Sequence, residues 1–314
     1  MAWAADPFVN VLGGSAPVND GFYFSSEANP QSGVPTAPGT FENRIRAVSL
    51  ISKTDTDTWG AQATLGNMHF GISPTFSDTG ASLSEDFWDV EVGATYRHRY
   101  DEGRELSGNF SVGSVGDVPF NTINETIFQF NGTYRWPSEG SHSWFVLVNW
   151  TNNRTFLNYV PIPGVGYAYR SEDKTFSYVF GFPVNMIYYE FAKGFYGRAG
   201  FTGISQANAE LSKTLAGPVR LYGAFDWGQR VWLPAGRMDL SDRLFLDQIK
   251  TSVGLRSPLS AYLLADMSVG YEFARNLFLA HSYYTSTRDG SLAIDPGWVA
   301  QLIISVRDLK QPMR

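Results

Sequence analysis

The sequence of 314 residues has no cysteine, little lysine and no long apolar run. The absence of cysteine excludes a disulfide scaffold, a thiolate metal site and a cysteine nucleophile. The longest apolar runs, such as 144–148 and 261–265, have five residues, whereas a helix needs roughly 18 or more to cross a bilayer. A helical membrane protein is therefore excluded. The formal net charge of −6 lacks the basic excess of a nucleic-acid-binding protein, so we expect no nucleic-acid partner.

What the chain does have is 15% aromatic residues and 31 glycines, a composition too apolar for a disordered chain. Residues 1–40 are rich in Gly, Pro, Ser and Asn and show no sustained period, which predicts an extended leader or a plug. Ala2, Trp3 and Ala4 have the small-x-small form of a signal-peptidase site, so we interpret the chain as one whose signal peptide has been removed.

From residue 41 to residue 307 the sequence alternates between apolar and polar side chains. In 87–100, even positions are apolar or aromatic, with His98 among them, and odd positions are mostly charged or small. Successive side chains of a strand point to opposite faces, so this pattern predicts strands with one apolar and one polar face. No window of 11 or more residues holds a convincing helical stripe. The sequence predicts an all-β chain.

Alternation alone does not tell a soluble barrel, with its apolar face inside, from a membrane barrel, with that face in lipid. Three features favour the membrane. Many runs cover 10–16 residues, against about 5–6 for strands of soluble sheets. The polar faces carry mostly Ser, Thr, Asn, Gln and Gly. Aromatic residues gather at the ends of the apolar faces, as in the girdles of membrane barrels; the predicted interfacial aromatics are Trp88, Tyr96, Tyr100, Tyr134, Trp136, Trp144, Trp150, Tyr271 and Phe273.

Over residues 41–308 the chain resembles Gram-negative outer-membrane β-barrel proteins of the porin-like, transport type. The resemblance implies a transmembrane antiparallel up-and-down β-barrel in the bacterial outer membrane. It also implies contact with membrane lipid and lipopolysaccharide, and insertion by the barrel assembly machinery. Such barrels commonly end in an aromatic residue, whereas this chain has its last aromatic at Trp298 and a tail at 309–314.

Loop lengths predict the number of strands, because long outer loops alternate with short inner turns. Longer connections lie near 77–85, 115–121, 154–161, 233–242 and 286–294. With 192–194 as a sixth outer loop, the expected number is 12 strands. Counting every alternating run, including 43–54, gives 14 as the alternative. In this scheme 181–183 is a bulge or a bend in a long strand, and 257–260 and 274–276 compete as turns.

The polar faces supply the candidate lumen. The predicted inward charges are Asp89, Glu91, Arg97, Arg99, Glu105, Glu125, Arg135, Arg198, Arg220, Asp226, Arg230, Lys250, Arg256, Asp266, Glu272 and Arg307. In a narrow barrel these charges would form ion pairs across strands, and in a wider one they would line a water-filled path. Both interpretations stay open at this point.

No catalytic constellation is evident in the sequence. His281 and Ser282 are adjacent, so on a strand they would point to opposite faces and could not meet. His69 is expected to face the lumen alone, and no two His have the spacing of a metal pair. We therefore expect no enzyme, no metal and no cofactor. The leading hypothesis is a channel or uptake pore for small solutes. The alternatives are a structural or surface-binding barrel with a plugged lumen, and a rim enzyme acting on lipid or peptide.

Overall fold

The computed structural model describes residues 21–29, 39–203, 205–285 and 288–306, and in them the chain is almost entirely β-strand. The first nine strands are β1 (Gly21–Asn29), β2 (Thr40–Lys53), β3 (Asp57–Phe70), β4 (Asp86–Arg99), β5 (Glu105–Gly116), β6 (Thr126–Pro137), β7 (His142–Thr151), β8 (Ile162–Arg170) and β9 (Phe176–Phe182). The others are β10 (Val184–Ala192), β11 (Phe195–Thr202), β12 (Gln206–Ala216), β13 (Val219–Trp232), β14 (Arg243–Pro258), β15 (Leu263–Ala280), β16 (Gly290–Ile294) and β17 (Gly297–Val306). Two short 3-10 turns are η3 (Asp101–Gly103) and η4 (Ile123–Glu125).

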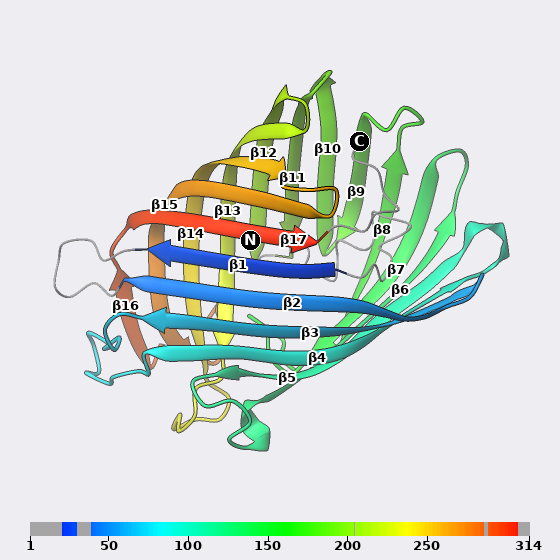
Figure 1. The fold of residues 1–314 in the computed structure, drawn as a ribbon. Helices are drawn as coiled ribbons and strands as arrows, with labels where there is room; N and C mark the ends of the chain where they lie inside the picture. The colour runs from blue at the N-terminus through cyan, green and yellow to red at the C-terminus, as the bar shows by residue number, and fades with distance from the viewer. Residues whose placement is uncertain (1–20, 30–38, 204, 286–287, 307–314) are drawn as a thin grey trace.

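Sixteen strands close into an antiparallel barrel, and β16 lies outside the ring (Figure 1). Consecutive strands pair from β1 to β15, β15 pairs with β17, and β17 pairs with β1. Closure depends on β1, which pairs with β17 on one side and β2 on the other. The short β16 pairs with the far end of β15, beyond the segment that β17 covers. Among the described residues, no helix is long and apolar enough to span a bilayer.

The expected numbers of 12 or 14 strands are therefore wrong, and weak local patterns explain why. Gly21–Asn29 lies within the segment expected to be a leader or plug, yet it is a wall strand. Its Ser25, Ser26 and Glu27 are polar in succession, which hides the period of two. The strand β12 is hard to recognise in the sequence, because small alanines at 207 and 209 stand where larger apolar residues would make the alternation visible. The rest of 1–40, the tail 309–314 and Arg307 lie outside the described residues.

Two connections were also misassigned. The expected bulge at 181–183 is a strand-to-strand connection, because β9 ends at Phe182, β10 begins at Val184, and Pro183 has no N–H for the sheet. The expected turn at 274–276 is a bulge inside β15. Ala274 adopts a positive φ of 52° there, and the register with β14 shifts between Asp247 and Ile249. The competing turn at 257–260 is confirmed in position, since β14 ends and β15 begins around 259–262.

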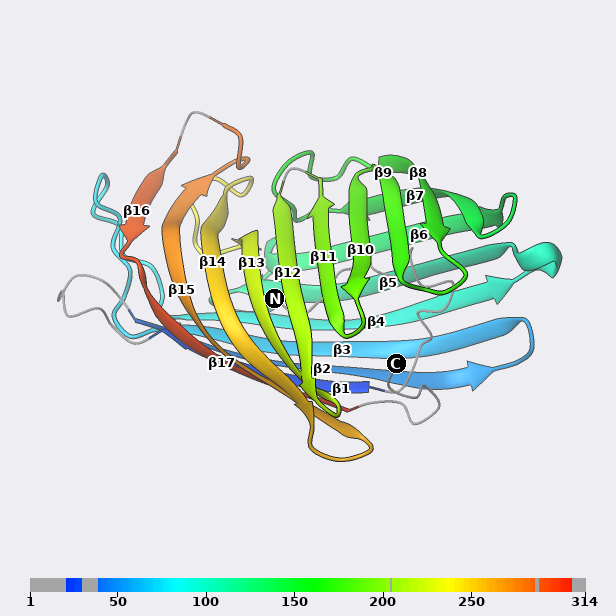
Figure 2. The ribbon, with the colours of Figure 1, turned by 90° about the horizontal axis from the view of Figure 1, so that it is seen from above.

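The barrel has a long-loop end and a short-turn end. The connections 71–85, 117–125, 152–161 and 233–242 lie at the long-loop end, together with the segment around β16. The connections 54–56, 100–104, 138–141 and 259–262 lie at the short-turn end, where β1 begins and β17 ends. The segment 192–194 was expected to be an outer loop, but it joins β10 to β11 at the short-turn end. Figure 2 shows the strands of the wall from a direction turned by 90° about the horizontal axis from that of Figure 1.

The apolar face of the wall points outward. Val92, Met267 and Trp298 are 61%, 56% and 66% exposed, although each belongs to an alternating strand. Their neighbours Glu272 and Arg97 on the opposite parity are buried. A soluble barrel would bury the first set and expose the second. The structure therefore has the inverted arrangement of a barrel whose exterior meets lipid.

The interior is not uniformly polar. Near the long-loop end, Phe87 of β4 packs against Trp232 of β13, with ring centroids 5.4 Å apart. This contact belongs to an apolar cluster made of Met68, Phe70, Phe76, Phe87, Trp232, Leu244, Leu246, Leu277 and Ile294. Because β4 and β13 belong to facing parts of the wall, the cluster fills one sector of the barrel and holds its two sides together.

Candidate functional site: the lumen and its mouth

Two adjoining cavities lie in the interior and are lined by both polar and apolar side chains. The larger has a volume of about 490 Å³ and is lined from facing walls, for example by Glu91 of β4 and Lys250 of β14. The smaller, of about 230 Å³, is lined by Arg256 and Ser305 near the short-turn end. Tyr23, Asn208, Asp226 and Gln301 line both cavities. The larger one also reaches the connections 152–161 and 203–205, so together the cavities extend from the long-loop end to the short-turn end.

Several ion pairs inside the barrel join strands that are not neighbours in the wall. The Lys250 ammonium of β14 lies 2.7 Å from the Glu27 carboxylate of β1, and β15 and β17 separate these strands. Arg230 of β13 likewise pairs with Glu42 of β2. Such contacts span the interior and narrow it. Charges taken out of bulk water need partners of this kind.

A glycine makes room for one of these pairs. Arg44 of β2 donates from Nη2 to Asp89 of β4 at 2.7 Å, passing over β3. A Cβ at Gly66 would lie 3.2 Å from the Cβ of Asp89 and 3.4 Å from Nε of Arg44. That is tighter than an ordinary contact, so the absence of a side chain at 66 lets the pair cross the intervening strand.

The β13–β14 loop (233–242) crosses the mouth and attaches to the opposite wall. The Leu233 N–H donates to the carbonyl of Val115 on β5 at 2.7 Å, and the Ala235 N–H donates to the Asp117 carboxylate at 2.7 Å. A Cβ at Gly116 would collide with the Leu233 carbonyl, so the close approach requires glycine. The loop thus closes part of the long-loop mouth from β13 to β5.

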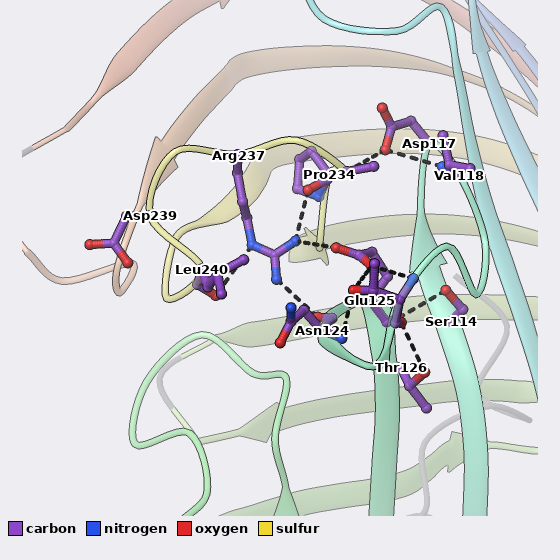
Figure 3. Close-up of polar contacts among 12 residues, drawn as sticks. Ser114, Asp117, Val118, Asn124, Glu125, Thr126, Pro234, Arg237, Asp239 and Leu240 are labelled. Carbon is purple, nitrogen blue, oxygen red and sulfur yellow. Dashed lines mark hydrogen bonds and ion pairs between the residues drawn. The ribbon is translucent and has the colours of Figure 1, made fainter.

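Arg237 anchors this loop. Its guanidinium lies 3.1 Å from the Glu125 carboxylate, and the two side chains are 2% and 4% exposed. It also donates to backbone carbonyls, at 2.7 Å to Pro234, 2.9 Å to Asn124 and 3.2 Å to Leu240 (Figure 3). A planar guanidinium with several partners in fixed directions is well suited to hold a loop in one position.

The turn that contains Glu125 holds its carboxylate in position for Arg237. It ends η4, where the backbone N–H and the hydroxyl of Thr122 both donate to its carboxylate, at 2.8 Å and 2.6 Å. Burial raises the pKa of the Glu125 carboxyl, but the hydrogen bonds from Thr122 and the charge of Arg237 outweigh it, so the pKa lies below its usual value. The carboxylate is therefore charged at neutral pH.

Half of the expected lumen charges line at least one of the two cavities, and the other described ones lie elsewhere in the wall or at its ends. Asp89, Glu91, Asp226, Arg230 and Lys250 line the larger cavity, and Arg198, Asp226, Arg256 and Asp266 line the smaller one. Glu272 and Arg97 are buried, Arg135 donates to Ser143, and Arg220 lies over the Tyr196 ring. Arg99 pairs with Glu105 beside the β4–β5 turn at the short-turn end. Glu125 requires a correction, because it ends η4 at the mouth and not the lumen face of a strand.

Several residues of the site were not singled out from the sequence. Glu27 lay in the expected leader, and Glu42 and Arg44 lay in a strand that the favoured number of 12 omitted. Arg154 and Arg237 are in connections, where the period of two gives no direction to a side chain. For Arg237, the sequence offers no signal that its partner is Glu125, which is 112 positions away.

The expected interfacial aromatics lie mainly along the outer face. Tyr100 contacts Tyr134, with centroids 6.3 Å apart, and Tyr134 contacts Trp136 at 5.8 Å. Trp144 packs on Tyr167 at 4.7 Å. Of the other predicted members, Trp88 is 36% exposed and Phe273 is half-buried. Tyr96 lies beside Trp59, and Tyr271 lies beside Trp298. The Trp150 indole donates to the Tyr159 carbonyl. The contacts among Tyr96, Tyr100, Tyr134, Trp136 and Trp144 and their neighbours follow the short-turn end, whereas the Tyr271–Trp298 contact lies toward the long-loop end. Aromatic groups near both ends of the wall are the placement expected of interfacial girdles.

A Ser–His–Asp group at the rim bears on the enzyme hypothesis. Asp242 accepts from Nδ1 of His281 at 2.8 Å, and the Ser241 hydroxyl lies 2.8 Å from Nδ1 and 2.7 Å from Nε2 of the same ring. A general base aligns one nitrogen with the nucleophile. An oxygen equidistant from both nitrogens is not aligned with either. Asp239 completes a set of possible metal ligands within 4.8 Å of one another, but two of its three members are exposed, and we assign no metal to it.

The prediction that the His69 side chain faces the lumen is wrong. His69 was expected to face the lumen, whereas it shares the outward parity of Leu65, which is 47% exposed. Its Nδ1 lies 3.1 Å from the Asp86 carboxylate, and the side chain is 43% exposed. The Gly, Ser and Thr that follow it suggested a polar face, but β3 ends at Phe70, so they belong to the following loop.

Comparisons with known proteins gave structural neighbours alone. No protein-family model and no curated protein matches the sequence. An outer membrane channel from Pseudomonas putida F1 is 10% identical, with a TM-score of 0.37, over 93% of this chain and 96% of that one. A mutant of the Rh. blastica porin is 10% identical, with a TM-score of 0.41, over 91% and 98%. The translocator domain of the autotransporter NalP from Neisseria meningitidis is 9% identical, with a TM-score of 0.35, over 96% and 92%.

The protein has the architecture of an outer-membrane β-barrel. The closed ring of sixteen strands, the outward apolar face and the charged interior are the features of this architecture in the described residues.

Proposed function

We propose that this protein is a channel or uptake pore for small polar solutes in the bacterial outer membrane. In this proposal the wall contacts membrane lipid and lipopolysaccharide, and the barrel assembly machinery inserts the chain. The long-loop end faces the exterior and the short-turn end faces the periplasm, as in other barrels of this architecture. No catalytic role is proposed, because the rim histidine is not aligned with its serine.

One observation carries the proposal. Two adjoining cavities, lined by charged, polar and apolar side chains, extend from the mouth loops to the short-turn end of a closed barrel. A purely structural barrel has no need for such a space and would be stabler with its interior filled. The ion pairs Lys250–Glu27 and Arg230–Glu42 and the β13–β14 loop limit the width of the path, so we expect small solutes to pass and large ones to be excluded.

Recording of single channels in planar bilayers tests the proposal. Protein folded in detergent, and shown to be folded by faster migration on a gel before boiling than after, should give discrete conductance steps in potassium chloride. Liposome swelling should then show entry of small sugars and exclusion of long oligosaccharides. Silence from folded protein would contradict the proposal and would favour the alternative of a structural barrel with a plugged lumen.

A further inference from the structure

The larger cavity holds a cation that the barrel does not neutralise. Arg154 extends from the β7–β8 connection and lines that cavity. Its Nη2 donates to the Asn149 carbonyl at 3.3 Å. Its Nε and Nη1 are buried and have no hydrogen-bond partner among the described residues. Burial lowers the pKa of this guanidinium, and no carboxylate opposes the effect. An ionised group in this state has lost hydration without gaining a counter-ion.

The contrast with the other cations of the cavity is clear. Arg44, Arg230 and Lys250 line the same space, and each has a carboxylate within ion-pair distance. Arg154 has no such carboxylate in the described part of the chain, although the barrel supplies one to every other cation of this cavity. Arginine binds carboxylates well, through planar, charge-assisted hydrogen bonds. The partner that Arg154 lacks is therefore an acceptor that carries negative charge and comes from outside the described residues.

The surroundings of Arg154 indicate what else the partner contains. The cavity wall includes Phe156 and Ile162, which follow Arg154 in the chain, and the hydrogen-bonding side chains of Asn149 and Asn208. The Asn208 side-chain oxygen is buried without a partner among the described residues. A binding space with apolar walls and a few polar groups that fix orientation is the usual form of a small-molecule site. Inorganic ions have no apolar part to place against Phe156 and Ile162.

We propose that Arg154 is the cation of a solute-binding subsite in the lumen, and that the solute is a small organic acid whose carboxylate pairs with Arg154 while its apolar part contacts Phe156 and Ile162. This inference deepens the proposed channel function and rests on it for the role of the subsite in transport. Binding itself does not depend on conduction, so the two can be tested separately.

Calorimetric titration of the detergent-folded protein with benzoate is the direct test, with benzamide as the neutral isostere and inorganic phosphate as a second anion. We expect benzoate to bind at least about tenfold more tightly than benzamide, the difference that corresponds to one charge-assisted hydrogen bond. The variant Arg154→Gln should lose this difference, and Arg154→Lys should keep part of it. The matched control is Arg104→Gln, which removes the same charge from an exposed pair with Glu102 at the short-turn end; it should bind benzoate like wild type.

Equal binding of benzoate and benzamide by the wild type would overturn the inference, even if Arg154→Gln failed to fold. Phosphate binding as tight as benzoate would overturn the assignment to an organic acid. A protein that conducts but does not prefer benzoate would refute the subsite and leave the channel function intact. A protein that binds benzoate more tightly than benzamide but gives no conductance and no liposome swelling would support the subsite and refute the channel function.

Discussion

The two mouth loops that carry a buried arginine use it in opposite ways. Arg237 in the β13–β14 loop has a carboxylate and three backbone carbonyls as partners. Arg154 in the β7–β8 connection has a single hydrogen bond to a carbonyl from its guanidinium and no carboxylate among the described residues. The Arg237 guanidinium holds the β13–β14 loop across the barrel through partners within the protein. The Arg154 guanidinium has two buried nitrogens without partners among the described residues, so it can bind a solute. The partners of each side chain therefore distinguish a structural arginine from a binding one.

The largest effect is expected from Arg237→Ala. This change leaves the Glu125 carboxylate buried without its counter-charge, a situation that costs about 3–5 kcal/mol. We expect the β13–β14 loop to detach from β5, which would raise the single-channel conductance and make 233–242 accessible to protease. Planar-bilayer recording and limited proteolysis of the folded protein measure both results.

Two further variants make this test specific. The double change Arg237→Met with Glu125→Gln removes both charges, so it should destabilise the mouth less than Arg237→Ala. Gly116→Ala leaves the ion pair in place but adds a Cβ that collides with the Leu233 carbonyl. It should open the same loop by steric means. If Arg237→Ala and Gly116→Ala both conduct like wild type, the loop does not limit the path.

An intermediate effect is expected from acid. The pKa of Glu125 is lowered in the folded protein, so its pairing with Arg237 contributes fully above the pKa of about 4.3 of a free glutamate. That contribution is lost as pH falls through the lowered value. We therefore expect conductance to stay constant from neutral pH down to about 5 and to rise below about 4.

The groups near this pair allow a control for the acid effect. Asp117 accepts from the backbone of the same loop, and Asp239 and Asp242 lie with His281 at its far end. These carboxylates are other acidic groups within the loop or in contact with it. The variant Glu125→Gln cannot gain a proton, so its conductance should lack the step that the wild type shows. If the step survived in this variant, the neighbouring carboxylates and not Glu125 would be its cause.

The same comparison shows how far the sequence could predict this molecule. The period of two gave the all-β class, the outward apolar face and the inward position of charges such as Asp89 and Lys250. It failed where the alternation is weak, as in β1 and β12, and the strand number was wrong for that reason. The partners of Arg237 and Arg154 could not be predicted, because they depend on which loops meet across the mouth, and loop side chains follow no period.

The smallest effect on stability is expected from Arg154→Met. The guanidinium of Arg154 gives up hydration without an ion pair, so a residue of similar length without charge removes a burial cost and loses one hydrogen bond of 3.3 Å. The two changes oppose each other. The temperature at which the folded band on a gel converts to the unfolded band should therefore stay within a few degrees of wild type, and it should fall clearly for Arg237→Ala. A large loss of stability in Arg154→Met would mean that this arginine holds the β7–β8 connection in place, and the distinction between the two loops would then disappear.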